Sequence, residues 1–142
     1  MKPLIRITRK EHFNAAHKMY RPDWSEAQNE AVFGKCSNHN WHGHNYDLYV
    51  TLEGEVNPET GYVADLKELS DLLKRKVVDV LDHKNLNLDV PFMQGILAST
   101  EHLALQIWEQ IEPEIPNLGN CRLHKILLYE TERNFVELQR PS

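Results

Sequence analysis

Hydrophobic and polar positions alternate along two long stretches in the first half of the chain, residues 4–19 and 42–56. A period of two is typical of strands that bury one face. Residues 20–33, which begin the segment between them, are polar and acidic, and we predict a loop there with one short helix over residues 25–32. A connection of this length inside a compact domain often has a functional role.

The middle of the chain changes to a helical period. Asp65 is predicted to cap a helix, with Glu68 completing a capping box. The apolar positions that follow form one stripe: Leu66, Leu69, Leu73, Val77 and Val80. Ser99 or Thr100 is predicted to cap a second helix, which ends at the prolines that follow it. Its apolar stripe consists of Leu103, Ile107 and Ile111, and the terminating prolines are Pro113 and Pro116.

Two more strands are predicted near the C-terminus. Residues 121–131 are apolar on both faces, which is typical of an internal strand, and residues 135–138 form the last strand after a turn. The order is thus strand, strand, helix, helix, strand, strand. Strands segregated from helices in this way indicate the α+β class: a four-stranded antiparallel sheet with two helices packed on one face.

Composition and net charge argue against some classes of function. The chain of 142 residues is 41% hydrophobic and 26% charged, which suits one domain over residues 1–142. Its formal net charge of −5 and the lack of any apolar run near about 20 residues argue against nucleic-acid and membrane partners. Two cysteines are too few for a disulfide framework, so we expect a reduced, cytoplasmic protein. No Gly-rich dinucleotide-binding motif occurs in the sequence.

One segment concentrates metal-binding and nucleophilic side chains. Residues 34–46 contain Cys36 and three histidines, of which His42 and His44 are one residue apart. On a strand these two point to the same face, and His17, at the end of the preceding strand, reaches the same point if the strands pair. A single histidine is more often a surface or packing residue than a ligand. Three imidazoles around one point, with no evident fourth protein ligand, instead describe a catalytic zinc site with an open position.

Short motifs follow one another along nearly the whole chain: Ala15-Ala16-His17, Phe33-Gly34-Lys35-Cys36, His42-Gly43-His44-Asn45-Tyr46, Leu81-Asp82-His83-Lys84-Asn85-Leu86-Asn87, Ser99-Thr100-Glu101 and Tyr129-Glu130-Thr131. In content and order they resemble the 6-pyruvoyl-tetrahydropterin synthase family, which also includes the 6-carboxytetrahydropterin synthases of queuosine biosynthesis. The resemblance implies the tunnelling fold, whose subunits join sheets edge to edge into a barrel. It also implies a homohexamer of two stacked trimers, with active sites at subunit boundaries.

The resemblance further implies a reaction. The substrate is 7,8-dihydroneopterin triphosphate, the product is 6-pyruvoyltetrahydropterin, and triphosphate leaves by elimination. Zinc on His17, His42 and His44 would acidify the substrate's diol. Cys36 is the candidate base, because nearby Zn²⁺ or imidazolium lowers a thiol pKa from about 8.5. The alternatives for Cys36 are an inert thiol and a fourth zinc ligand.

Asp82 and His83 resemble the family's second acid–base pair, which forms a relay with Cys36. Neighbouring residues do not easily bring their side chains into contact. We therefore expect Asp82 to face Cys36 or nearby backbone. The alternative is an ordinary helix C-terminus, where a charged His83 favours the helix dipole.

Glu130 is expected to accept two hydrogen bonds from the amino-pyrimidinone edge of the pterin, the alternative being a solvated strand-end carboxylate. Ser99, Thr100 and Glu101 are expected to hold the ring at a helix N-terminus, the alternative being ordinary capping. Nearby cations for the triphosphate, none of them singled out, are Lys18, Arg21, Lys35 and Lys84. Histidines without a motif are His12, His39, His102 and His124.

Three other functions remain open. A 6-carboxytetrahydropterin synthase acts on the same substrate and also releases acetaldehyde. The long segment from His17 to Cys36 and the spacer at residues 37–41 resemble the pyruvoyl branch, although His39 and Trp41 stand where Pro and Gly are common. A non-catalytic scaffold would keep a structural zinc and a pterin pocket. A generic three-histidine hydrolase would need no carboxylate facing a pterin.

Overall fold

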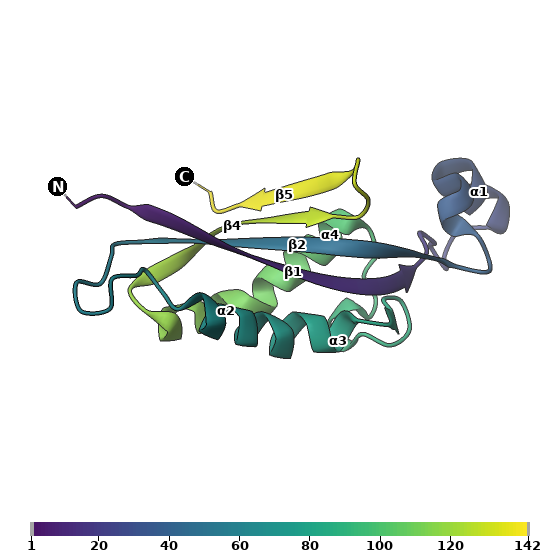
Figure 1. Ribbon diagram of the computed structural model, residues 1–142. Coiled ribbons are helices and arrows are strands. Elements are labelled where there is room, and N and C mark those ends of the chain that lie inside the picture. The colour runs from purple at the N-terminus through teal and green to yellow at the C-terminus, as the bar shows by residue number, and fades with distance from the viewer. Residues whose placement is uncertain (1, 142) are drawn as a thin grey trace.

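The computed structural model describes residues 2–141, in which five strands form one sheet with helices packed on one face (Figure 1). The strands are β1 (Ile5–His17), β2 (His42–Gly54), β3 (Lys84–Asn85), β4 (Cys121–Tyr129) and β5 (Phe135–Gln139). Their order across the sheet is β3-β1-β2-β4-β5. All neighbours are antiparallel except β1 and β3, which run parallel. The α+β class is confirmed.

The predicted number of four strands is wrong, because β3 adds a fifth. This strand has two residues and pairs only with Ala15 and Ala16 of β1. A segment this short has no periodicity that sequence alone can reveal. The prediction of an internal strand from residue 121 is confirmed, since β4 pairs with β2 on one side and β5 on the other, although β4 ends at Tyr129 and not at residue 131.

The α-helices are α1 (Glu26–Phe33), α2 (Leu66–Leu73), α3 (Asp79–Leu81) and α4 (Thr100–Ile111). A π-helical turn, Lys74–Val78, joins α2 to α3, so the apolar stripe predicted after Asp65 lies on one continuous helical stretch. Short 3-10 helices occupy Gly34–Ser37, Pro91–Met93 and Glu112–Leu118. None of the helices within residues 2–141 combines the length and apolar character needed to cross a lipid bilayer.

The helix caps follow the sequence with one exception. The Ser99 side chain caps α4 by accepting a hydrogen bond from the His102 amide. Asp65 caps α2 through the Lys67 amide, but within the described chain Glu68 makes no return bond, so the predicted capping box is wrong. Capping reduces the number of unpaired amides at a helix start. The α4 cap matters most here because it holds Thr100 beside the sheet.

The β1–β2 ladder organises the rest of the chain. It runs without interruption from Ile5 opposite Gly54 to His17 opposite His42. One face of the whole sheet is buried under α2, α3 and α4 (Figure 1). Its fully buried side chains include Phe13, Tyr46, Leu48, Val50 and Leu52. The opposite face is largely polar, and no helix of residues 2–141 lies over it.

Candidate metal centre and substrate pocket

The candidate centre lies at the end of the β1–β2 ladder from which α1 projects (Figure 1). His17 is opposite His42, and His44 is opposite Ala15, one step further into the sheet. Residues two apart on a strand share a face, and so do directly opposed residues of an antiparallel pair. The three imidazoles therefore gather on the helix-covered face, with ring centroids 4.5, 4.9 and 5.0 Å apart.

Each imidazole turns one nitrogen toward the shared space. His17 Nδ1 lies 2.8 Å from the carbonyl oxygen of Ala98, so its N–H donates there and Nε2 is left for the cluster. His17 Nε2, His42 Nδ1 and His44 Nε2 are buried and have no hydrogen-bond partner within residues 2–141. Buried polar atoms are nearly always paired. These three atoms therefore mark a site that a further group completes.

Glu130 also reaches this cluster. Its Oε1 lies 2.9 Å from His44 Nε2 and 4.0 Å from His17 Nε2. The shorter contact lacks the angle of a hydrogen bond, since His44 Nε2 remains without a partner. Donor atoms of the three histidines and Glu130 all lie within 4.8 Å of one another. The end of β4 therefore brings a carboxylate, which the sequence did not indicate as a neighbour of the histidines, against β2.

Thr100, the first residue of α4, positions this carboxylate. Its hydroxyl donates a hydrogen bond of 2.6 Å to Oε2 of Glu130, and the residue is buried. Ser99 instead uses its side chain to cap the helix. Glu101 is exposed and makes no side-chain hydrogen bond or ion pair within the described chain. Of the three residues predicted at this helix start, Thr100 alone therefore contacts Glu130.

Burial sets the protonation of the cluster. Desolvation lowers the pKa of His17, and the nearby His42 and His44 lower it further, while the bond to Ala98 opposes the shift. Desolvation likewise lowers the pKa of His44, with Glu130 acting in the opposite direction. Both imidazoles are therefore neutral at neutral pH. Neutral imidazole is the form that offers a lone pair to a metal ion.

Two groups at the site were missed by the sequence analysis. Tyr46 is fully buried, and its hydroxyl has no hydrogen-bond partner within residues 2–141. Desolvation raises the pKa of this hydroxyl, and Glu130 raises it further. Its position two residues after His44 was a signal that it shares the same face. The carbonyl of Ala98 had no such signal, because a backbone atom is placed by the fold and not by residue type.

Cys36 lies in the 3-10 turn Gly34–Ser37 and is exposed. Its carbonyl oxygen accepts a hydrogen bond of 2.7 Å from the amide of Met19, two residues beyond His17. This bond fixes the cysteine backbone near the entrance of the centre. Cys36 does not belong to the group of converging donor atoms in the described chain. The alternative of a sulfur ligand that closes the site is therefore not supported.

Asp82 and His83 follow the end of α3 and lie against the edge of β1. The amide of Asn14 donates to Asp82 Oδ1 at 2.8 Å, and the amide of His83 donates to the carbonyl of Asn14 at 2.6 Å. The Asn14 bond lowers the pKa of Asp82, and the contact with His83 lowers it further. The His83 side chain is 83% exposed, so the pair faces outward.

The expectation that Asp82 would not contact His83 is wrong. Asp82 Oδ2 lies 2.9 Å from Nδ1 of the His83 ring. The physical reason is local: His83 has φ of 59°, and this left-handed turn brings two adjacent side chains to the same side. Neither residue joins the donor group around His17 within this chain.

Comparison with known proteins places the chain in a family. Residues 6–141 match the family model described as 6-pyruvoyl tetrahydropterin synthase. The chain is 41% identical over 130 residues to the 6-pyruvoyl tetrahydrobiopterin synthase of Pongo abelii, covering 92% of this chain and 88% of that protein. A 6-carboxy-5,6,7,8-tetrahydropterin synthase of Rickettsia conorii is 25% identical over 151 residues, covering 95% of this chain and all of that protein.

A solved structure agrees with the sequence matches. The fold superposes on Caenorhabditis elegans 6-pyruvoyl tetrahydropterin synthase with a TM-score of 0.89 and 34% identity, covering 99% of this chain and 98% of that one. Sequence and fold thus match over essentially the same length. The chain belongs to the 6-pyruvoyl tetrahydropterin synthase family and is a carbon–oxygen lyase of that type.

Proposed function

We propose that the protein uses zinc on His17, His42 and His44 to convert 7,8-dihydroneopterin triphosphate to 6-pyruvoyltetrahydropterin with loss of triphosphate. The observation that carries this proposal is the convergence of three unpaired imidazole nitrogens beside a carboxylate. The identity to pyruvoyl-type relatives exceeds that to the 6-carboxy relative, which supports the pyruvoyl product.

The donor set fits zinc. Zinc takes neutral imidazole nitrogens at about 2.0–2.1 Å in tetrahedral sites, which places ligand atoms about 3.3 Å apart. The observed donor atoms lie within 4.8 Å of one another, so small side-chain rotations bring them to that spacing. When bound, zinc supplies a Lewis acid that lowers the pKa of a coordinated hydroxyl to about 7. The bond from His17 to Ala98 keeps the ring in the tautomer that leaves Nε2 free.

Glu130 is proposed to bind the pterin ring. Thr100 holds Oε2, and a carboxylate so held accepts hydrogen bonds from the amino-pyrimidinone edge with defined geometry. A second role is favoured by the same contacts, since Oε1 is 2.9 Å from His44 Nε2 and could serve as a fourth metal donor. The two roles differ in whether metal affinity depends on Glu130.

Cys36 is proposed as the base that removes a proton from the substrate side chain. The thiol is exposed, and the Cys36 backbone is hydrogen-bonded to Met19, two residues beyond the predicted zinc ligand His17. Asp82 and His83 are proposed as the partner acid–base pair. Because they face outward from the edge of β1 and not toward their own histidine cluster, they are proposed to act at the centre of a neighbouring subunit.

Sheet edges support the proposed assembly. Beside β1, β3 covers only Ala15 and Ala16, so most of that edge is unpaired within the described chain, as is the outer edge of β5. Unpaired edges favour strand-to-strand association. We propose the tunnelling-fold barrel, with two trimers forming a hexamer. Light scattering after gel filtration should then give six times the 16.6 kDa of one chain, and a monomer would contradict the assembly.

The test of the reaction is direct. Zinc-loaded protein is incubated with 7,8-dihydroneopterin triphosphate, and the products are identified by mass spectrometry. We expect 6-pyruvoyltetrahydropterin and inorganic triphosphate. Release of acetaldehyde would assign the carboxy branch instead. Absence of substrate consumption with zinc bound would indicate a binding scaffold.

A further inference from the structure

Lys18 stands at the mouth of the candidate centre, one residue beyond His17, and we propose that its ammonium group binds the polyphosphate tail of the substrate. This inference rests on the proposed function and extends it to a residue that the motifs do not single out.

The order of groups along the sheet matches the order of parts in the substrate. Glu130 directly follows β4, and its side chain reaches the inner histidine, His44, at 2.9 Å. The pair of opposed histidines that ends the β1–β2 ladder comes next, and Lys18 and Trp41 follow directly beyond it. In the substrate the ring, the diol and the triphosphate also follow one another in a line. With the ring at Glu130 and the diol at the histidines, the triphosphate extends toward Lys18.

The Lys18 ammonium group is held by two aromatic rings. Its Nζ lies 4.4 Å from the ring centroid of Trp41 and 4.8 Å from that of Tyr20. The side chain of Asn87 bonds both the amide and the carbonyl of Lys18, at 3.2 and 3.1 Å. Trp41 adopts φ of 65°, a conformation that costs free energy in a non-glycine residue. Backbone and side chain are therefore both held in position before any ligand arrives.

The charge of Lys18 is not neutralised within the described chain. Several other lysines place Nζ within 4.0 Å of a carboxylate oxygen: Lys2, Lys10, Lys67, Lys76 and Lys125. No carboxylate of residues 2–141 does so for Lys18, whose Nζ is near aromatic faces instead. Aromatic faces attract the cation without cancelling its charge. The ammonium group thus remains available to an anion.

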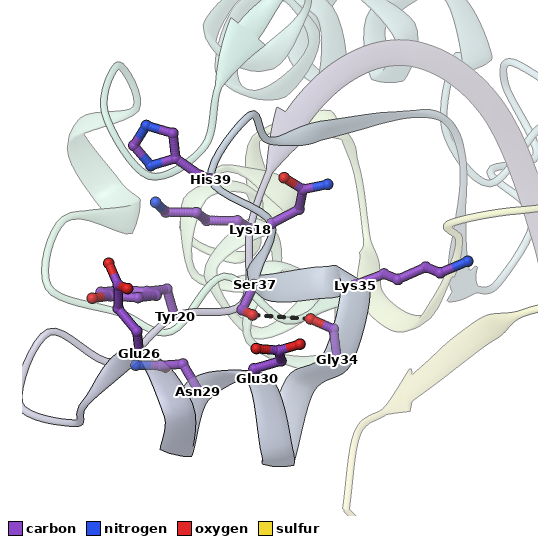
Figure 2. A pocket seen from close by; sticks show the side chains of 10 residues that line it. Lys18, Tyr20, Glu26, Asn29, Glu30, Gly34, Lys35, Ser37 and His39 are labelled. Carbon is purple, nitrogen blue, oxygen red and sulfur yellow. Dashed lines mark hydrogen bonds between the residues drawn. The ribbon is translucent and has the colours of Figure 1, made fainter.

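Two cavities meet at Lys18, and their charges differ. The first, of 690 Å³, carries the carboxylates of Glu26 and Glu30 on its α1 side, which would repel a polyanion (Figure 2). The second, of 740 Å³, has Asp23 as its one carboxylate among the described residues. That carboxylate is paired with Arg21, with the closest atoms 2.8 Å apart. We therefore assign the triphosphate to the second cavity.

Binding of inorganic tripolyphosphate, followed by calorimetry, tests the site itself. Lys18→Met keeps the length of the side chain and should weaken binding about tenfold, the effect of one charge-assisted contact. Lys10→Met is the matched control, because its Nζ also faces an aromatic ring, that of Tyr49, at 5.6 Å, but on the helix-free face of the sheet. Both metal-loaded and metal-free protein are measured, since polyphosphates also bind zinc. The loss of tripolyphosphate affinity caused by Lys18→Met should be the same in the metal-loaded and the metal-free protein.

Steady-state kinetics connect the site to catalysis. Lys18→Met should raise KM for dihydroneopterin triphosphate about tenfold with kcat within about twofold and zinc content unchanged. Lys18→Arg should recover most of the affinity because it restores the charge. Equal tripolyphosphate binding by wild type, Lys18→Met and Lys10→Met would overturn the inference while leaving the proposed function intact. Loss of zinc or a fall in kcat alone would make Lys18 a structural residue and would also overturn it.

A failure of the proposed function gives a different pattern. If wild-type protein does not consume the substrate but Lys18→Met still loses tripolyphosphate binding, the reaction assignment falls and the anion site stands. If wild-type protein does not consume the substrate and Lys18→Met binds tripolyphosphate as wild type does, the reaction assignment and the anion site are both wrong.

Discussion

The β1–β2 ladder carries a buried polar cluster near each end, and the two clusters differ in how completely they are paired. Near the end that starts β1, Glu53 is 5% exposed and its carboxylate accepts hydrogen bonds from Arg6 at 2.9 Å and from Arg122 at 2.7 and 3.1 Å. At the other end, one ring nitrogen each of His17, His42 and His44 is also buried but has no hydrogen-bond partner within residues 2–141.

The difference in hydrogen bonding indicates a structural role for the first cluster and a functional role for the second. A buried polar group that is fully hydrogen-bonded stabilises one arrangement of the fold. A buried polar group left without a partner is destabilising unless something else completes it. The Glu53 cluster is complete within the chain itself, so we assign it a structural role. The histidine cluster is not completed by any group of residues 2–141, and it contains the residues that we propose bind zinc.

The largest effect is expected from removing a ligand of the open cluster. His44→Ala should abolish metal binding and reduce kcat/KM by about 10³-fold or more, because several kcal/mol of Lewis-acid stabilisation are lost. The control is His124→Ala, which removes a histidine whose Nδ1 lies 3.7 Å from Glu53. Zinc content by mass spectrometry and turnover are measured together. Normal zinc content and turnover in His44→Ala would show that this cluster is not the centre.

Cys36→Ala should reduce kcat by about 10²–10⁴-fold, the contribution of a positioned base, while zinc content stays unchanged. Cys121→Ala is the control, since burial raises the pKa of that thiol and keeps it unreactive. An alkylating reagent should modify the exposed Cys36 first and inactivate the enzyme in parallel. Unchanged turnover in Cys36→Ala would exclude it as the base.

The same substitution in both clusters sharpens the comparison. Glu130→Gln should raise KM by about 10–100-fold, because a charge-assisted bidentate contact to the ring is lost. Glu53→Gln should leave KM unchanged and lower the melting temperature, because two arginines lose their shared partner. Zinc content decides the role of Glu130. If Glu130→Gln binds zinc more weakly, the carboxylate is a metal donor.

The smallest effects are expected in the pH dependence of stability of the metal-free protein. The folded-state pKa of His17 and of His44 is lowered from 6.5, so below pH 6.5 the unfolded chain binds protons that the folded chain does not, and stability falls. The pKa of Glu53 is lowered from 4.5 by Arg122 and Arg6, so its contribution is present above pH 4.5 and is lost as pH falls through the lowered pKa.

Urea unfolding across this pH range measures both windows. Glu53→Gln should remove only the loss of stability that occurs below pH 4.5. Added zinc should prevent only the loss of stability that begins just below pH 6.5, where the histidines start to take up protons. A single transition common to both clusters would contradict their separation.

Local patterns predicted much of the fold. Strand alternation placed β1 and β2 within a few residues of their observed ends, and the stripe after Asp65 marked one helical stretch despite its π-helical turn. The His-x-His spacing and the end of the preceding strand brought three imidazoles to one point because pairing is in register. The two-residue β3 and the contact between Asp82 and His83 could not be predicted, since neither has a periodic signal.

The sequence by itself determined the four longer strands, the main helices and the three histidines, because these depend on periodicity and on register between neighbouring strands. Only the tertiary structure decided that Glu130 joins those histidines, that Ala98 sets the tautomer of His17, and that Lys18 lies between two rings. The contacts of Glu130 and of Ala98 with the histidines join segments far apart in sequence. Their geometry follows from how the sheet and α4 pack, and no local pattern encodes it.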